Sequence, residues 1–226
     1  MKIVHFGGWL GNWSKLPAAD LYICTGNMLP NYPVRFDVKN AARSRTDRAR
    51  EIYLQAKAVR AFDAGPYLGN PTAPVVVCRG NKDFVSYAKL FKSQRVYEIG
   101  ETEGSFYVCG VNIAGMRGTP VTSYTKRWVD EVLPGEWEAK AAKIPKKIDI
   151  LVTHASRVLL PCLTDPGSAG EGIEARAHLS SWNTAFSHCQ DGDVTVGCAA
   201  GGYMVWNWNG RRLYHMKSRK GLFLKN

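Results

Sequence analysis

The stretch that decides the fold is Val75-Val76-Val77-Cys78-Arg79-Gly80-Asn81-Lys82-Asp83. It begins as an apolar, β-branched run and changes at Gly80 into a polar and charged segment. Such a run is typical of a strand that is buried on both faces, and open α/β sheets carry their sites at the C-terminal ends of such strands. The stretch therefore predicts a buried strand over 75–79 that delivers Asn81, Lys82 and Asp83 to a functional site.

Two earlier segments follow the same pattern. Lys2–Phe6 leads into a glycine-rich loop, and Leu21–Cys24 leads into Thr25-Gly26-Asn27. Because glycine tolerates a positive φ, a glycine cluster directly after a strand predicts a tight loop. Strands that each end in a glycine loop favour an α/β layer sandwich.

The remaining elements are predicted from residue periodicity. We expect further strands over 95–99, 105–109, 111–115, 148–153 and 193–196, and helices over 40–62, 84–92 and 173–188. The helix over 40–62 has an apolar stripe made of Ala49, Ile52, Ala56 and Val59. Near the C-terminus, Asn209-Gly210 lies between alternating aromatic residues, which predicts a two-residue type I′ hairpin turn.

Length and composition indicate one globular domain over residues 1–226, of which 45% are hydrophobic. No run of about 18 apolar residues predicts a transmembrane helix. The N-terminus enters a strand pattern without a signal peptide, so we expect a cytoplasmic protein. Six cysteines without any C-x-x-C pair then favour reduced thiols over disulfides.

The charge balance favours an anionic partner. Thirty Lys and Arg residues against nineteen Asp and Glu residues give a formal net charge of +11, which suits a nucleic acid, an acidic protein surface or a phosphorylated ligand. Cations gather along the helix over 40–62 and in a later basic segment, and they are Arg43, Arg50, Lys57, Lys140, Lys143, Lys146 and Lys147. One interpretation is a surface that contacts phosphates, and the other is a solvated face that serves only solubility.

Five segments at the ends of predicted strands carry a family resemblance. In chain order they are His5-Phe6-Gly7-Gly8-Trp9-Leu10-Gly11-Asn12, Ala19-Asp20-Leu21-Tyr22-Ile23-Cys24-Thr25-Gly26-Asn27, Gly80-Asn81-Lys82-Asp83, Thr153-His154-Ala155 and Val196-Gly197-Cys198-Ala199-Ala200-Gly201-Gly202. In order and spacing they resemble the motifs of the calcineurin-like metallophosphoesterases. The resemblance implies a metallophosphoesterase-like α/β sandwich, with two packed mixed β-sheets flanked by helices.

The same resemblance implies that the catalytic metals have been lost. Members of the family hold two metal ions that activate water and bind the phosphoryl oxygens. Of the eight matching ligand positions only Asn81 and His154 keep the family residue, and the six changed positions are Gly8, Leu10, Asn27, Lys82, Cys198 and Ala200. Two neutral ligands do not hold a dinuclear cluster. We therefore expect no catalytic residue, no metal and no cofactor.

The vestigial site has two interpretations. Asn81, Lys82, His154 and Asn27, together with backbone N–H groups, form a candidate anion-binding site, because a lysine ammonium binds phosphate oxygens. In the alternative, Lys82 points to solvent, and Leu10 and Trp9 fill the pocket. The glycine loop 165–170 matches a family loop that borders the site.

These observations lead to one preferred function and its alternatives. The preferred hypothesis is a pseudoenzyme that binds a macromolecular partner, as an inhibitor or a scaffold. The alternatives are a nucleic-acid- or nucleotide-binding protein, or a residual phosphodiesterase with a non-standard site. The expected partner is an acidic protein surface or a nucleic acid and not a membrane, and a small phosphate ligand stays open.

Overall fold

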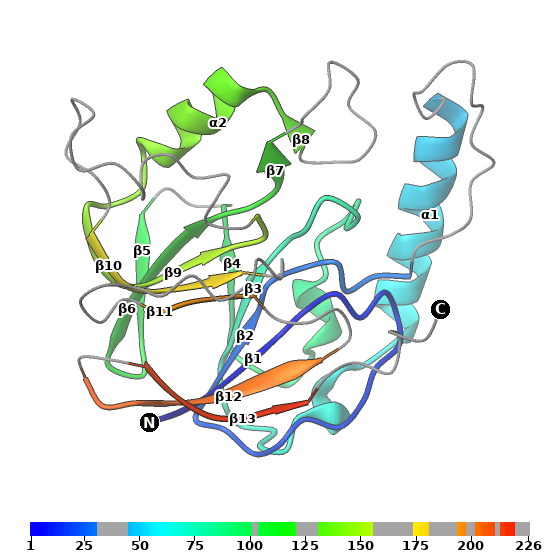
Figure 1. The fold of residues 1–226 in the computed structure, drawn as a ribbon. Helices are drawn as coiled ribbons and strands as arrows, with labels where there is room; N and C mark the ends of the chain where they lie inside the picture. Colours follow the sequence, from blue (N-terminus) through cyan, green and yellow to red (C-terminus); the bar gives the residue numbers. More distant parts are fainter. Residues whose placement is uncertain are drawn as a thin grey trace.

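The structure is a computed structural model that describes residues 1–30, 45–100, 104–120, 131–155, 174–180, 194–197, 202–210 and 213–219. These residues form an α/β architecture with several mixed sheets and few helices (Figure 1). The α/β class predicted from the sequence is therefore confirmed.

The larger sheet contains the strands that the glycine loops follow. Its six strands run in the order β13-β12-β1-β2-β3-β4. Their bounds are β1 (Lys2–Phe6), β2 (Leu21–Cys24), β3 (Val75–Cys78), β4 (Val96–Ile99), β12 (Tyr203–Trp208) and β13 (Leu213–Arg219). Strands β1 to β4 pair in parallel, and β12 pairs antiparallel with β1 and β13. The C-terminal ends of β1, β2 and β3 consequently lie side by side.

The smaller sheet has five strands in the order β11-β10-β9-β6-β5. Their bounds are β5 (Ser105–Val108), β6 (Val111–Met116), β9 (Lys147–Thr153), β10 (Glu174–Ser180) and β11 (Val194–Gly197). All neighbours pair in parallel except β5 and β6. A separate two-stranded sheet joins β7 (Thr119–Pro120) to β8 (Glu131–Val132).

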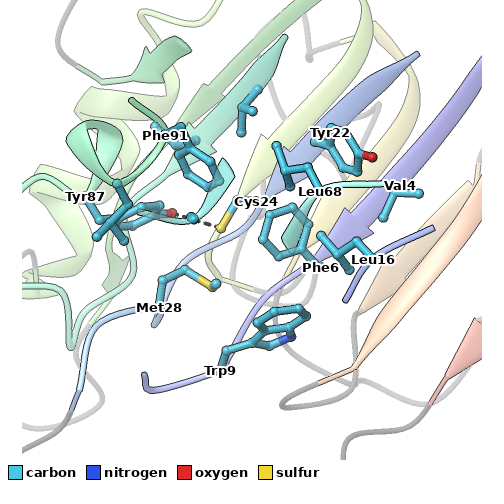
Figure 2. Close-up of a cluster of buried hydrophobic side chains, with 14 of the residues drawn as sticks. Val4, Phe6, Trp9, Leu16, Tyr22, Cys24, Met28, Leu68, Tyr87 and Phe91 are labelled. Atoms are coloured by element: carbon cyan, nitrogen blue, oxygen red, sulfur yellow. Dashed lines mark hydrogen bonds between the residues drawn. The ribbon is translucent and has the colours of Figure 1, made fainter. Parts of the chain in front are cut away.

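The two sheets pack face to face through a shared hydrophobic core. Ile3, Ile23 and Val76 of the larger sheet lie in one buried cluster with Ile150 and Val152 of the smaller sheet. Because side chains alternate along a strand, the intervening residues of β1 to β3 enter a second core on the opposite face. Figure 2 shows this second core. Burial on both faces explains why these strands read as nearly continuous apolar runs.

Helix α1 (Arg45–Ala61) buries a largely polar face, so the predicted apolar stripe is wrong except at Val59. Glu51 and Gln55 are buried beside Val59, whereas Ala49 is exposed and Ile52 is 45% exposed. The face contacts loop peptide groups, and Gln55 supplies the polar side chain that hydrogen-bonds to them. Residues 40–44 of the predicted helix lie outside the described residues.

Helix α2 (Pro134–Ala141) covers the outer face of the smaller sheet, where Trp137 and Ala141 pack with Ala114 and Leu151 in a third core. Two short 3-10 helices, η1 (Gly65–Tyr67) and η2 (Ala88–Leu90), complete the helices of the described segments. In the described part of the chain, no helix has the length and apolar character needed to cross a membrane.

Two predicted helices are wrong where the structure describes them. Over 84–92 only η2 forms, because Phe84 N–H donates to the Gln55 side chain and Ala88 N–H donates to Ser86 Oγ. Over 174–180 the chain forms strand β10, which pairs with β9 and β11. This pairing overrides the local helix preference of a segment rich in Ala, Glu and Arg. Residues 181–188 lie outside the described residues.

The C-terminal hairpin forms with a longer connection than predicted. Trp208 of β12 pairs with Leu213 of β13, so residues 209–212 connect the strands. Gly210 has a φ of +92°, whereas Asn209 is not among the described residues with a positive φ. A type I′ turn needs a positive φ at both central residues. The two-residue turn is therefore wrong.

Candidate functional site

The candidate site lies where the loops after β1, β2, β3 and β9 meet. The first two loops run side by side, with Gly8 N–H donating to Gly26 O at 2.8 Å and Leu10 N–H donating to Asn27 O at 3.0 Å. Leu10 and Asn27 have φ values of 49° and 55°, in the left-handed region that few non-glycine residues adopt. The geometry of both loops is thus set by their pairing.

Two glycines bring the loops after β2 and β3 into contact. A methyl group on Gly26, whose φ is +98°, would lie 2.7 Å from Gly80 Cα. A methyl group on Gly80 would collide with Asn27 Oδ1 and lie 2.7 Å from His154 Cε1. Only glycine permits such a close approach of backbone and side chains at these positions.

Asp83 holds the same two loops together. Its Oδ2 accepts the N–H groups of Asn27 at 2.6 Å and Gly80 at 2.9 Å, and its Oδ1 accepts those of Met28 at 2.9 Å and Leu29 at 3.0 Å. Burial raises the pKa of Asp83 to about 6, although the four backbone donors act in the opposite direction. These donors occupy the lone pairs that a carboxylate offers, so Asp83 serves as a structural clamp.

Two amides continue the network from loop to loop. Asn27 Oδ1 accepts Lys82 N–H at 2.9 Å, and Asn27 Nδ2 donates to Asn81 Oδ1 at 3.4 Å. Asn81 Nδ2 in turn donates to Glu131 Oε1 at 3.4 Å. Sequence reasoning missed Glu131, because it lies on the short strand β8 with no motif beside it.

His154 closes the network from the smaller sheet. Its Nδ1 lies 2.8 Å from Thr25 O, a contact that requires the ring to donate from Nδ1. In the neutral ring Nε2 is then an acceptor, and it lies 3.3 Å from Asn81 Oδ1. Burial lowers the pKa of His154 to about 4; the bond to Thr25 O opposes this shift, and the charge of Lys82 adds to it. His154 is therefore neutral at pH 7.

The charges near this network are mixed in sign. Lys82 is half-buried, and its ammonium acts on His154. Glu131 adds a carboxylate beside Asn81. An anion would thus meet one cation, a neutral imidazole and a nearby negative charge. This balance weakens the interpretation of a strong phosphate site.

Trp9 belongs to the second core. It is 1% exposed, packs against Phe6 with ring centroids 5.4 Å apart, and donates from Nε1 to Gly202 O at 3.0 Å. Figure 2 shows it among the core side chains. Leu10 is half-buried.

Gln55 of α1 fixes the loop that carries Lys82 from outside the sheet. Its Nε2 donates to Lys82 O at 2.9 Å and Pro30 O at 3.1 Å, and its Oε1 accepts Phe84 N–H at 2.7 Å. The side chain has no exposed area. Sequence periodicity missed this role, because a single glutamine in a helical pattern gives no sign of its partners.

The described residues do not fit the two-metal centre that the family resemblance implies. Gly8 and Leu10 have no metal-ligating side chain, and Asn81 and His154 offer only neutral ligand atoms, which face each other. Within the described segments, no group of three or more His, Cys, Asp or Glu side chains is placed to hold a metal ion. Cys198 and Ala200 lie outside these segments.

The predicted basic residues lie in two separate regions, on α1 and from α2 to the start of β9. Arg50 and Lys57 are exposed on α1. The half-buried Lys140 lies on α2, the exposed Lys143 and Lys146 follow it, and the exposed Lys147 begins β9. Figure 1 shows α1 and α2 well apart, so these cations form two patches. Arg43 and the glycine loop 165–170 lie outside the described residues.

Comparison with known proteins adds no family assignment. The chain matches no protein-family model, and no curated protein shows a significant match to it.

Proposed function

We propose that this chain is a metallophosphoesterase-like protein without hydrolytic activity, which acts by binding a macromolecular partner as an inhibitor or a scaffold. The metallophosphoesterase-like sandwich is part of the proposal and rests on the five motif-like segments at the strand ends. One observation supports the proposed loss of hydrolytic activity. The polar side chains that meet at the strand ends are engaged with the protein's own loops, as in the four backbone bonds of Asp83.

The chemistry of hydrolysis explains why this observation matters. The family reaction needs carboxylates and imidazoles that hold metals with an open position for water. Here Asn27 bonds to Lys82 N–H, and His154 donates from Nδ1 to Thr25 O. These side chains join the loops to one another, which supports a protein that keeps the fold and acts by binding.

A second candidate, nucleic-acid binding, is favoured by the surface of α1. Arg50 and Lys57 are exposed there, and Glu51 on the same helix is buried. With a net charge of +11, this surface attracts polyanions. The two candidate functions are compatible, because a nucleic acid is itself a macromolecular partner.

Two measurements on the full-length chain test the proposal. Elemental analysis after incubation with manganese should find no stoichiometric metal, and a generic phosphodiester should be hydrolysed no faster than the buffer blank. Affinity capture from the native host, with a nuclease-treated control, should recover a specific macromolecule. Stoichiometric manganese together with turnover would overturn the loss of hydrolysis, and capture without any specific partner would overturn the binding function.

A further inference from the structure

The exposed face of α1 carries cations and an aromatic ring in one stripe. Arg50, Tyr53, Lys57 and Arg60 are all exposed, and Tyr53 is 60% exposed. At 100° per residue these four positions fall within an arc of about 80°, and they extend about 15 Å along the helix. We call this set the α1 stripe.

The stripe has one sign of charge. Between residues 48 and 61, where the helix side chains are described, the acidic residue is Glu51, which is 1% exposed on the opposite face. The stripe therefore presents three cations without an exposed carboxylate between them. Such an arrangement complements a polyanion and repels a second cationic surface.

The helix beneath the stripe is anchored to the core of the protein. Gln55, on the buried face, bonds to Pro30, Lys82 and Phe84, and Val59 packs into the second core. These contacts fix the helix backbone, so the four exposed side chains start from defined positions. Preorganisation of this kind lowers the cost of ordering a binding surface.

We propose that the α1 stripe binds single-stranded nucleic acid, with Arg50, Lys57 and Arg60 contacting phosphates while a base stacks on Tyr53. This inference rests on the proposed binding function and names its partner class. Aromatic side chains among cations are how proteins hold single strands without sequence preference.

The aromatic ring selects among the polyanions. An unpaired base offers a free face for stacking, whereas the bases of a duplex are already stacked. A carboxylate is repelled by the electron-rich face of a phenol ring, so an acidic peptide gains nothing from Tyr53. Single-stranded nucleic acid is therefore the ligand that uses all four side chains.

Fluorescence anisotropy of a short labelled oligothymidylate tests the proposal, with the full-length chain titrated at several salt concentrations. Tyr53→Ala should weaken binding about tenfold through the lost stacking, and Tyr53→Phe should keep the affinity. The triple change Arg50→Gln, Lys57→Gln, Arg60→Gln should make the log–log salt slope less steep by about 2, because each single-strand phosphate contact contributes about −0.7.

A matched control uses the second patch. The triple change Lys143→Gln, Lys146→Gln, Lys147→Gln removes the same charge away from α1, and it should leave affinity and salt slope close to those of the parent chain. Thermal unfolding of each variant confirms that it is folded. Equal weakening by both triple changes, loss of affinity in Tyr53→Phe, or a preference for duplex would overturn the proposal.

The outcomes separate this inference from the proposed function. The oligonucleotide could fail to bind while capture from the host recovers a protein and no phosphodiester turnover is seen. In that case the proposal that the α1 stripe binds nucleic acid is refuted, and the proposed binding function stands. If the chain hydrolyses phosphodiesters with stoichiometric metal, the loss of hydrolysis fails, whatever the anisotropy shows.

Discussion

Asp83 and His154 should contribute to stability with opposite dependence on pH. Burial raises the pKa of Asp83 from 3.8 to about 6 and lowers that of His154 from 6.5 to about 4. The folded chain thus binds the Asp83 proton more tightly than the unfolded chain, and it binds the His154 proton more weakly. The contribution of Asp83 is fully present below about pH 4 and is lost as the pH rises through about 6. That of His154 is present above about pH 6.5 and is lost as the pH falls through about 4.

The magnitudes follow from the two shifts. One pKa unit corresponds to about 1.4 kcal/mol, so each group changes the free energy of unfolding by about 3 kcal/mol across its window. Between about pH 4 and about pH 6 the changes of the two contributions with pH nearly cancel, because the folded chain holds one extra proton on Asp83 and lacks one on His154. The charge of Lys82 acts on His154, and the charge of Asp83 acts on the buried phenol of Tyr87.

The perturbation is His154→Asn, since an asparagine amide can still donate to Thr25 O but does not titrate. Urea unfolding, followed by tryptophan fluorescence, gives the free energy of unfolding for the parent and the variant at each pH. The stability advantage of the parent over the variant should grow by about 2–3 kcal/mol between about pH 4.5 and about pH 7.

The variant Asp83→Asn gives the opposite sign. The stability advantage of the parent over this variant should shrink as the pH rises through the same window. The parent loses the contribution of Asp83 over this range, whereas the variant has no such contribution to lose and keeps that of His154. Differences between parent and variant cancel the titration of distant groups. A difference for His154→Asn that stays constant with pH would refute the reasoning, since it would mean that the folded imidazole is not desolvated.

Three further predictions concern the loops and the candidate site. Gly80→Ala should lower the free energy of unfolding, measured by chemical denaturation, by more than about 2 kcal/mol, because the added methyl group collides with Asn27 and His154. Gly135→Ala is the control: a methyl group there meets nothing within 4 Å, so this change should be neutral or stabilising. Gln55→Ala should cost about 2–4 kcal/mol because it removes three hydrogen bonds to buried peptide groups, and Lys57→Ala on the exposed face should cost under about 0.5 kcal/mol. Lys82→His alone should give no phosphodiester turnover above the parent, because Gly8, Leu10 and Asn27 still lack the donors of a metal centre; strong turnover would show that the site was aligned wrongly.

The strands that lead to the site were predictable because their signal is local. The apolar runs of β1, β2 and β3 stop at glycines, and the structure ends each strand within one residue of its predicted boundary. Alternating burial between two cores favours apolar residues on both faces of a strand, which is why these runs are nearly continuous.

The errors arose where distant partners decide the structure. Residues 174–180 read as helical in isolation but form a strand between β9 and β11. Hydrophobic spacing predicts Ile52 on the buried face of α1, whereas Gln55 occupies that face because loop peptide groups lie opposite. A periodicity rule counts apolar residues, so it cannot anticipate a polar side chain that satisfies buried backbone groups.

The site shows the same limit, because its hydrogen bonds join residues that are far apart in the sequence. Asn27 accepts from Lys82 N–H and also donates to Asn81, which a bridging carboxylate at this position cannot do. His154 is neutral at pH 7, and the Asp83 carboxylate is satisfied by backbone donors. Close carboxylates that need cations to offset their repulsion are thereby avoided. The loops after β2, β3 and β9 are therefore joined through hydrogen bonds of Asn27, Asp83 and His154.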